Sequence, residues 1–226
     1  MTSNPSRGIR RGLPLALAGA VLSSALLSGC GALLVGGIVV GGTMIATDRR
    51  TTGAQVDDVT IEVKSSSRMS ETFADRARID TTSYNRLVLL TGEVPTAEDK
   101  TRAEQVVARV PNVSAVVNEI TVGPLNTFGE RSKDTYITTK VKTSLVDAKD
   151  LFANSIKVTT HRGVVYLMGR VTEREATRAS EVARGVSGVV KVVRVFELIS
   201  EAELAQTQPK SVVPADPAAS AAIVRP

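Results

Sequence analysis

The chain has 226 residues, a formal net charge of +5 and few aromatic side chains, with four Phe, three Tyr and no Trp. One cysteine and one histidine allow neither an internal disulfide framework nor a zinc site built from Cys and His, which needs three or four such ligands. The scarcity of aromatic rings argues against a surface that stacks bases, so no nucleic-acid partner is expected.

The first 29 residues have the organisation of a secretory signal peptide. Arg7, Arg10 and Arg11 form a basic start, and an apolar run over residues 13–27 ends among small residues. Removal of residues 1–29 takes away three arginines and no acid, so the formal charge of the remaining chain falls to +2. A basic surface on a periplasmic protein is more plausibly directed to anionic lipid or glycan than to nucleic acid.

The only cysteine, Cys30, follows this segment directly. The sequence Leu27-Ser28-Gly29-Cys30 resembles the bacterial lipobox, in which cleavage precedes the cysteine and the new N-terminus carries a diacylglycerol and an acyl chain. We therefore expect Cys30 to be lipidated and expect no cofactor apart from this covalent lipid. The alternative is that Cys30 is a buried free cysteine at a helix end. Gly31 replaces the aspartate typical of inner-membrane retention, which favours the periplasmic leaflet of the outer membrane.

Residues 30–55 are expected to form a tether that is rich in glycine at its start. The apolar stretch over residues 31–46 is shorter than the roughly 20 residues that a membrane-spanning helix needs. It is interpreted as a flexible lipid-proximal tether, or as a helix that packs through Gly37 and Gly41. At the other end, residues 200–226 are predicted to be a disordered tail, because Pro, Ala and Ser dominate without periodicity.

The central part of the chain contains an internal repeat. Residues 79–94 align with residues 156–171 at an offset of 77, and residues 101–113 align with residues 177–189 at an offset of 76. Asp58 aligns with Asp134 at the offset of 76 as well. The sequence therefore predicts two small domains of one design, over residues 56–124 and 130–199.

The second copy shows the order of elements most clearly. Asp134 is expected to cap a first amphipathic helix, and Thr172 and Glu175 form a capping box for the second. Alternating residues before and after His161-Arg162-Gly163 predict a β-hairpin. Each unit is then α-β-β-α-β, an α+β fold in which a three-stranded mixed sheet carries two helices on one face. The predicted elements of the second copy are a helix over 134–148, strands over 156–160 and 164–168, a helix over 172–185 and a strand over 189–198.

These units carry a family resemblance. Each has a glycine at a turn after its second strand, Gly92 or Gly169, and a Val-x-Asn-Val or Val-x-Gly-Val turn before its third. In this order they resemble BON domains, and two of them behind a lipobox resemble the dual-BON outer-membrane lipoproteins of Gram-negative bacteria. The resemblance implies a non-enzymatic lipoprotein that binds anionic phospholipid through its second BON domain and supports envelope integrity, often at division sites. Phosphatidylglycerol and cardiolipin of the outer membrane's inner leaflet are the expected lipid partners.

The two copies differ in charge in a way that bears on lipid binding. Residues 56–129 hold 8 basic and 11 acidic residues, whereas residues 130–199 hold 13 basic and 8 acidic ones. In the second copy Lys133, Tyr136 and Lys140 are predicted to share an exposed helix face, a combination suited to a layer of lipid headgroups. The first copy has Asp57, Thr60 and Lys64 there. The alternative is that Tyr136 packs against the other domain or a loop.

No catalytic or metal-binding site is predicted. His161 is expected in a hairpin turn, no serine has an evident base, and no Gly-rich phosphate loop follows a strand. A wall hydrolase would need a pair of carboxylates in one cleft, which the sequence does not indicate. The alternative to a lipid-binding protein is a periplasmic adaptor for cell-wall or outer-membrane assembly proteins.

Overall fold

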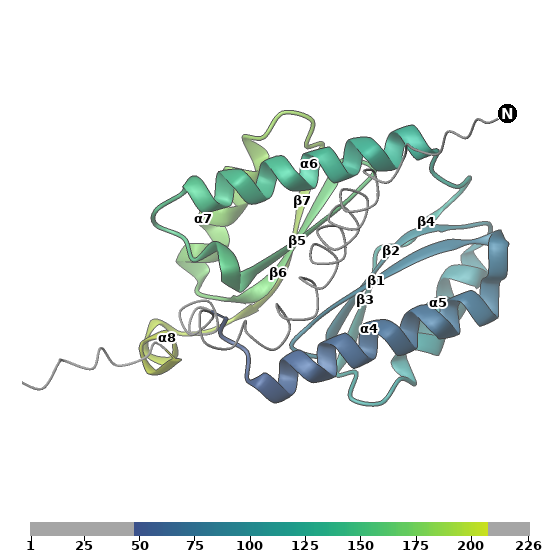
Figure 1. Ribbon diagram of the computed structural model, residues 1–226, viewed down its shortest axis with the longest axis horizontal. Helices are drawn as coiled ribbons and strands as arrows, with labels where there is room; N and C mark the ends of the chain where they lie inside the picture. Colours follow the sequence, from purple (N-terminus) through teal and green to yellow (C-terminus); the bar gives the residue numbers. More distant parts are fainter. Residues whose placement is uncertain (1–47, 208–226) are drawn as a thin grey trace, which may run out of the picture. The chain divides into compact units, whose positions relative to one another are not determined.

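The computed structural model describes residues 48–207, which lie in one compact unit spanning residues 46–226. The expected signal peptide, Cys30 and most of the tether fall outside the described residues. Figure 1 shows two copies of one arrangement, each a sheet with helices packed on it. The α+β fold predicted from the repeat, with two α-β-β-α-β units, is confirmed.

The first domain runs from α4 to β4. Its strands form the order β1-β2-β3, with β1 antiparallel and β3 parallel to the central β2, and the short β4 extends the parallel edge. The sheet is therefore mixed, since the hairpin gives the antiparallel pair and the crossover through α5 gives the parallel one. The elements are α4 (Thr52–Phe73), β1 (Arg78–Tyr84), β2 (Leu87–Val94), α5 (Ala97–Ala108), β3 (Ala115–Asn118) and β4 (Thr121–Val122).

The second domain repeats this topology as β5-β6-β7. The predicted capping box is present at α7, where the Thr172 side chain accepts from the Glu175 backbone and the Glu175 carboxylate accepts from the Thr172 backbone. The elements are α6 (Phe128–Asp147), β5 (Ile156–His161), β6 (Val164–Val171), α7 (Glu173–Arg184) and β7 (Lys191–Leu198), followed by α8 (Glu201–Thr207).

The prediction that Asp134 caps α6 is wrong. The helix begins six residues earlier with Thr127 as its N-cap, and Glu130 completes a capping box. Asp134 instead lies buried within the helix, where its two carboxylate oxygens accept from the backbone N–H groups of Arg162 and Gly163 at 2.8 Å. These two residues form the β5–β6 turn and both have positive φ, so the carboxylate fixes a tight hairpin.

The equivalent residue of the first domain does the same. Asp58 accepts from the backbone N–H groups of Asn85 and Arg86 in the β1–β2 turn at 2.8 and 2.7 Å. The Ser83 hydroxyl donates to it at 2.7 Å and Arg50 at 2.8 Å. A buried aspartate on the first helix thus holds the hairpin turn of each domain.

Each sheet has two covered faces. One face of each carries its domain's helices over an apolar core, with Val88 and Leu90 in the first domain and Val165 and Leu167 in the second. The alternating residues Leu89 and Tyr166 point to the opposite face. There they join a third buried cluster that contains residues of both domains: Tyr84, Leu89, Tyr166, Met168 and Val195. The two domains therefore pack through the sheet faces that their helices leave bare.

A short segment before α4 contacts both domains. Arg49 donates from two nitrogens to the Glu175 carboxylate at 2.7 Å, and its side chain is only 6% exposed. Arg50 pairs with Asp58 and lies 4.3 Å from the centroid of the Tyr84 ring. Two consecutive arginines therefore fix this segment to the second and the first domain, respectively.

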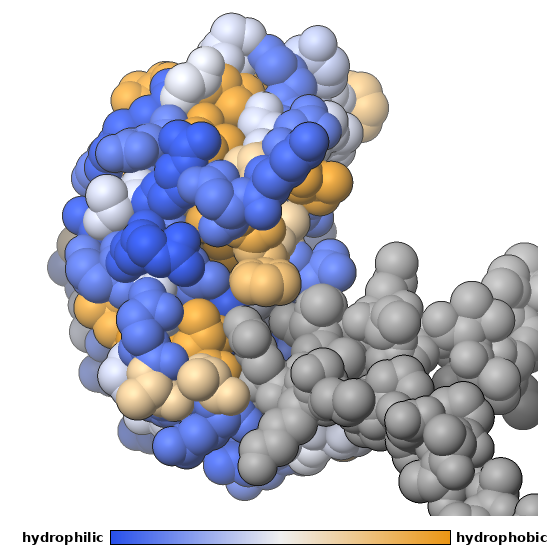
Figure 2. Space-filling model, turned by 90° about the vertical axis from the view of Figure 1, so that its left-hand side faces the viewer, coloured by the Kyte–Doolittle hydropathy of each residue, from blue (hydrophilic) through white to orange (hydrophobic). Residues whose placement is uncertain are grey.

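The predicted tail begins differently from the expectation. Residues 201–207 form α8, in which Leu204 is 6% exposed. Ion pairs from Arg170 to Glu203 and from Arg174 to Glu201 also join this helix to the second domain. The face turned to the viewer in Figure 2 mixes hydrophilic residues with smaller hydrophobic patches, as is normal for a protein surface. Among the helices of residues 48–207, none has both the length and the apolar character needed to cross a membrane.

Candidate functional site

The candidate site lies on the outer face of α6. Ile137, Val141 and Leu145 point from this helix into the core of the second domain, so the remaining sides of the helix face outward. Tyr136 is 65% exposed and Lys133 is exposed beside it along the helix, whereas Lys140 is half-buried. The structure thus exposes Lys133 and Tyr136 but leaves Lys140 half-buried, and Tyr136 does not pack against the other domain.

Tyr136 and Lys140 contact one another. The Lys140 ammonium group lies 5.4 Å from the centroid of the Tyr136 ring, a cation–π geometry. The same ammonium donates to the Ser187 carbonyl at 3.0 Å and bonds the Ser187 hydroxyl, which ties α6 to the loop before β7. Lys133 lies at a separate hollow of about 200 Å³, which Glu130, Arg162 and Val190 also line.

Three exposed apolar residues of this region were missed by the sequence reasoning. Phe128 is 78% exposed at the start of α6, with the Arg131 guanidinium 5.9 Å from its ring centroid. Val146 at the end of α6 is 65% exposed, and Val190 in the loop before β7 is 79% exposed. Phe128 was overlooked because the helix was expected to start at Asp134. The capping box Thr127–Glu130 is the signal that could have found it.

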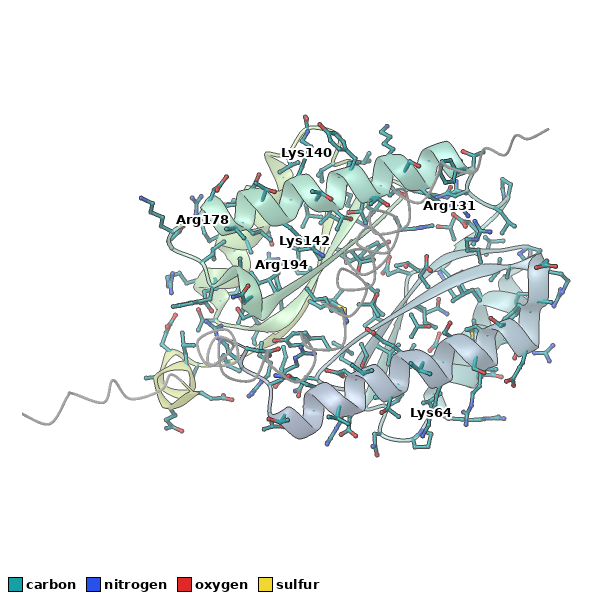
Figure 3. All side chains as sticks on the ribbon, viewed as in Figure 1. Lys64, Arg131, Lys140, Lys142, Arg178 and Arg194 are labelled. Atoms are coloured by element: carbon teal, nitrogen blue, oxygen red, sulfur yellow. The ribbon has the colours of Figure 1, made fainter. Side chains whose placement is uncertain are left out.

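The cations of α6 differ from two arginines of the second domain, Arg178 and Arg194, in lacking acidic partners. Within the described residues, Arg131, Lys133, Lys140 and Lys142 form no ion pair, whereas Arg178 of α7 and Arg194 of β7 pair with Asp150 and Glu173 at 2.9 and 3.2 Å. Figure 3 shows Arg131, Lys140 and Lys142 spread along α6.

Two of the three acids of this helix are engaged elsewhere, and the third, Asp147, is exposed at its last position. Glu130 caps the helix, where hydrogen bonds from the Thr127 backbone and hydroxyl hold its pKa below the usual range. Asp134 is buried under the hairpin turn. Neither Glu130 nor Asp134 therefore neutralises a cation of α6 through an ion pair.

The same face of the first domain has different chemistry. Thr60 takes the place of Tyr136, and Asp57, in the place of Lys133, pairs with Arg86 at 2.7 Å. Three valines of α4 are exposed by 62–65%: Val56, Val59 and Val63. In the second domain the equivalent positions, at an offset of 76, hold Ser132, Thr135 and Thr139. The fold therefore does not require valine there.

The contacts described above involve neither the expected lipidation site nor a group of catalytic residues. Cys30 lies outside the described residues. Within residues 48–207 no group of three or more His, Cys, Asp or Glu could hold a metal ion. His161 is not part of the turn but ends β5, buried at 8% exposure, with its Nε2 atom 3.1 Å from Glu93 of the first domain.

Comparison with known proteins identifies the domains. The BON domain family matches residues 57–124 and 133–199. "Outer membrane lipoprotein DolP" of Haemophilus influenzae is 38% identical over 175 residues, which cover 76% of this chain and 90% of the relative. The "21 kDa hemolysin" of Actinobacillus pleuropneumoniae is 36% identical over 154 residues, covering 67% of this chain and 79% of that protein.

A solved structure is similar only distantly. CdsD, a structural protein of the type III secretion system of Chlamydia trachomatis, is 14% identical, with 64% of this chain and 95% of that chain covered at a TM-score of 0.28. A likeness of that size carries no argument. The family is instead assigned from the two domain matches and the DolP relative, and neither of these points to a known enzyme family. The chain belongs to the BON-domain family, as an outer-membrane lipoprotein with two BON domains.

Proposed function

We propose that this lipoprotein binds anionic phospholipid of the outer membrane's periplasmic leaflet through α6 of its second BON domain, and that this contact supports envelope integrity, including at division sites. The observation that carries the proposal is the exposed Tyr136 ring among cations that have no acidic partner. Phosphatidylglycerol and cardiolipin are the expected ligands.

The chemistry of α6 suits a headgroup layer. Each lysine or arginine near an anionic membrane surface contributes about 1 kcal/mol to binding. Aromatic side chains with a polar tip favour the boundary between headgroups and acyl chains, and Tyr136 and Phe128 are both exposed. Val146 adds an exposed apolar side chain near the end of the helix.

The internal comparison supports the assignment to the second domain. Both domains share the fold, so a difference between equivalent surfaces does not arise from folding alone. The aromatic ring and one cation are present only on α6 and are replaced on α4 by Thr60 and Asp57. The excess of basic over acidic residues is likewise confined to residues 130–199.

Lipidation would allow this second contact to be weak. We propose that Cys30 carries a diacylglycerol and an acyl chain, which places the domains permanently beside the membrane. A tethered surface then acts at a high effective concentration, so millimolar intrinsic affinity is sufficient. Binding should also fall as salt rises, because exposed charges are screened beyond about 8 Å at physiological ionic strength.

Vesicle flotation tests the proposal. A chain beginning at residue 46 is expected to fold by itself, because that unit contains the cores of both domains and their interface. It should float with vesicles containing phosphatidylglycerol or cardiolipin and not with neutral phosphatidylcholine vesicles. Tyr136→Glu, or Lys133→Glu with Lys140→Glu, should lower binding at least tenfold.

The matched control is Thr60→Glu, at the equivalent position of the first domain. It should leave flotation unchanged. Equal loss in Thr60→Glu and Tyr136→Glu, or equal binding to neutral and anionic vesicles, would refute the assignment. Melting curves should show that each variant remains folded.

A second candidate function rests on the three exposed valines of α4. An apolar stripe that the fold does not require favours a protein-interaction adaptor, with cell-wall or outer-membrane assembly proteins as partners. Val59→Glu should then abolish in-cell cross-linking of this protein to its partner without affecting vesicle flotation. Unchanged cross-linking would remove the observation that favours an adaptor.

A further inference from the structure

A cavity opens between the second half of α6 and strand β5. Its volume is about 230 Å³. Leu145, Ile156 and Val158 form its buried apolar wall, with exposures of 1%, 8% and 5%. Lys142 and Val146, both on α6, lie at the exposed side. The cavity therefore combines an apolar interior with a cation at its opening.

The first domain has a cavity at the equivalent place, between α4 and β1. Its volume is about 310 Å³, and five of its lining residues match lining residues of the second cavity at the repeat offsets of 76 and 77. The equivalent pairs are Ser66 and Lys142, Met69 and Leu145, Ser70 and Val146, Ala77 and Ala153, and Ile79 and Ile156. The BON fold thus leaves the same space in both copies.

The two cavities differ at the residues of the first helix that line their openings. Where the first domain has the two hydroxyl residues Ser66 and Ser70, the second has an ammonium group and an apolar side chain, Lys142 and Val146. The first cavity is also lined by Asp75 and Arg78, two residues of opposite charge, whereas Lys142 is the one charged residue among the described residues that line the second. At the cavity opening, as on the outer face of the first helix, the second domain has a basic residue where the first has none. On the outer face it also has an aromatic residue.

The cavity adjoins the proposed lipid face, because Lys142 and Val146 belong to the helix that carries Tyr136 and Lys140. Figure 3 labels Lys140 and Lys142 on different sides of α6. Lys142 lines the cavity beside β5, whereas Arg194 belongs to β7 at the other edge of the sheet. Lys142 is exposed and forms no ion pair within the described residues, whereas Arg194 is paired with Glu173. The charge at the opening is thus available to a phosphate.

We propose that the cavity of the second domain takes a segment of one acyl chain of an anionic phospholipid, with Lys142 pairing with the lipid phosphate. This inference rests on the proposed function and names a subsite within it. The volume is below the roughly 300–1,000 Å³ of sites that enclose whole small molecules, so the headgroup and the second chain stay outside. The apolar wall gives a chain segment the burial that drives its entry.

A soluble probe tests the subsite without a bilayer. Monomeric lysophosphatidylglycerol, below its micelle concentration, should give nuclear Overhauser effects from its chain methylenes to the methyl groups of Val146, Ile156 and Val158. The methyl groups of Met69 and Ile79 in the first cavity should show none. Glycerol 3-phosphate supplies the headgroup alone and should produce no such contacts. Neutral lysophosphatidylcholine should bind more weakly.

A matched pair of cavity-filling variants gives the second readout. Ala153→Leu should weaken binding of lysophosphatidylglycerol at least tenfold, since each methylene excluded from an apolar site costs about fourfold in affinity. Ala77→Leu fills the equivalent space of the first domain and should leave the affinity unchanged. Lys142→Gln should weaken lysophosphatidylglycerol but not its neutral analogue. If Ala153→Leu does not fold, the nuclear Overhauser effects between the lipid chain and the two cavities of the unmodified protein test the subsite by themselves.

The outcomes separate the two proposals. Flotation with anionic vesicles together with chain contacts in neither cavity, or equally in both, overturns the subsite and leaves the function of the α6 face intact. Loss of flotation selectivity overturns the proposed function, while the lysophospholipid contacts still report on the cavity alone. Contacts confined to the second cavity and abolished by Ala153→Leu establish the subsite.

Discussion

Thr82 and Thr159 occupy equivalent positions in the two domains, and their hydroxyl oxygens meet 3.4 Å apart. The buried cluster between the sheets follows the same rule, because it includes both members of the equivalent pair Leu89 and Tyr166. Equivalent surfaces that contact each other are the mark of a two-fold axis, as in a symmetric homodimer. The two BON domains of this chain pack as such a dimer would, with a covalent link between its halves.

The first prediction concerns a polar contact across this interface. Glu93 is 1% exposed and lies 3.2 Å from Arg162 and 3.1 Å from His161 of the other domain. Glu93→Gln should lower the free energy of unfolding by about 1–3 kcal/mol, because the Arg162 guanidinium loses its charged acceptor. Denaturant titration measures this. Glu98→Gln, an exposed change on α5, serves as the control and should have little effect.

A second prediction concerns acid stability. Burial favours the neutral form of Asp58, but the bonds from Ser83, Arg86, Arg50 and Asn85 outweigh it, and its pKa lies below the usual range. A depressed pKa contributes stability that is present above the unfolded value of about 4 and lost as pH falls below it. Asp58→Asn should therefore cost about 1.5–3 kcal/mol at pH 7 and flatten the loss of stability in acid.

Unfolding curves at several pH values between neutrality and pH 2 would check this. The control is Asp75→Asn, at an exposed residue beyond the end of α4. If both variants follow the acid profile of the unmodified protein, the hydrogen bonds to Asp58 are not the source of that profile.

The third prediction concerns Gly169, which was expected in a turn after the second strand. It lies within β6, paired with Ile156, and a Cβ atom there would be 2.4 Å from the Ser155 carbonyl oxygen. Gly169→Ala should lower stability by about 1–3 kcal/mol through this overlap. Gly129→Ala, on α6 with no atom within 4 Å of the added carbon, should instead raise it slightly. The melting temperature should therefore fall in Gly169→Ala and rise slightly in Gly129→Ala, each relative to the unmodified protein.

The fourth prediction concerns the anchor. Cys30→Ala should remove acylation and outer-membrane fractionation, while the melting curve of the folded unit stays unchanged, because residues 46–226 form a unit of their own. Mass spectrometry of the intact protein and membrane fractionation provide the measurements. Acylated protein in the outer membrane of this mutant would contradict the proposed site.

The repeat made most of the fold predictable. A period of 76–77 residues meant that ambiguous elements of one copy could be identified from the clearer copy, and the Thr172–Glu175 capping box marked α7 correctly. The same alignment paired Asp58 with Asp134 but gave them the wrong role. A buried aspartate that accepts bonds from a distant turn has no local signature, and local sequence favours its interpretation as a helix cap.

The candidate site was predictable only in part. Tyr136 and Lys140 follow from helical spacing, since residues i and i+4 share a face. Val190 belongs to a loop that approaches another element only in the folded domain, and the cavity beside Lys142 depends on how α6 lies on β5. The sheet face with Leu89 and Tyr166 could not be assigned, because strands buried on both faces show no clear alternation of polarity.

The grip of Arg49 on Glu175 and of Arg50 on Asp58 has a mechanical consequence. A force applied at the proposed anchor is transmitted to the folded unit at Arg49 and Arg50, which contact the second and the first domain. The force therefore acts on the interface between the two domains and not on α4 alone. Cys30 is 19 residues before Arg49, so the proposed lipid can lie at most about 68 Å along the chain from this attachment point. Deleting residues between Cys30 and Arg49 would restrict how the folded unit can rotate at the membrane. It would thereby determine whether α6 or α4 can face the membrane, without altering either surface.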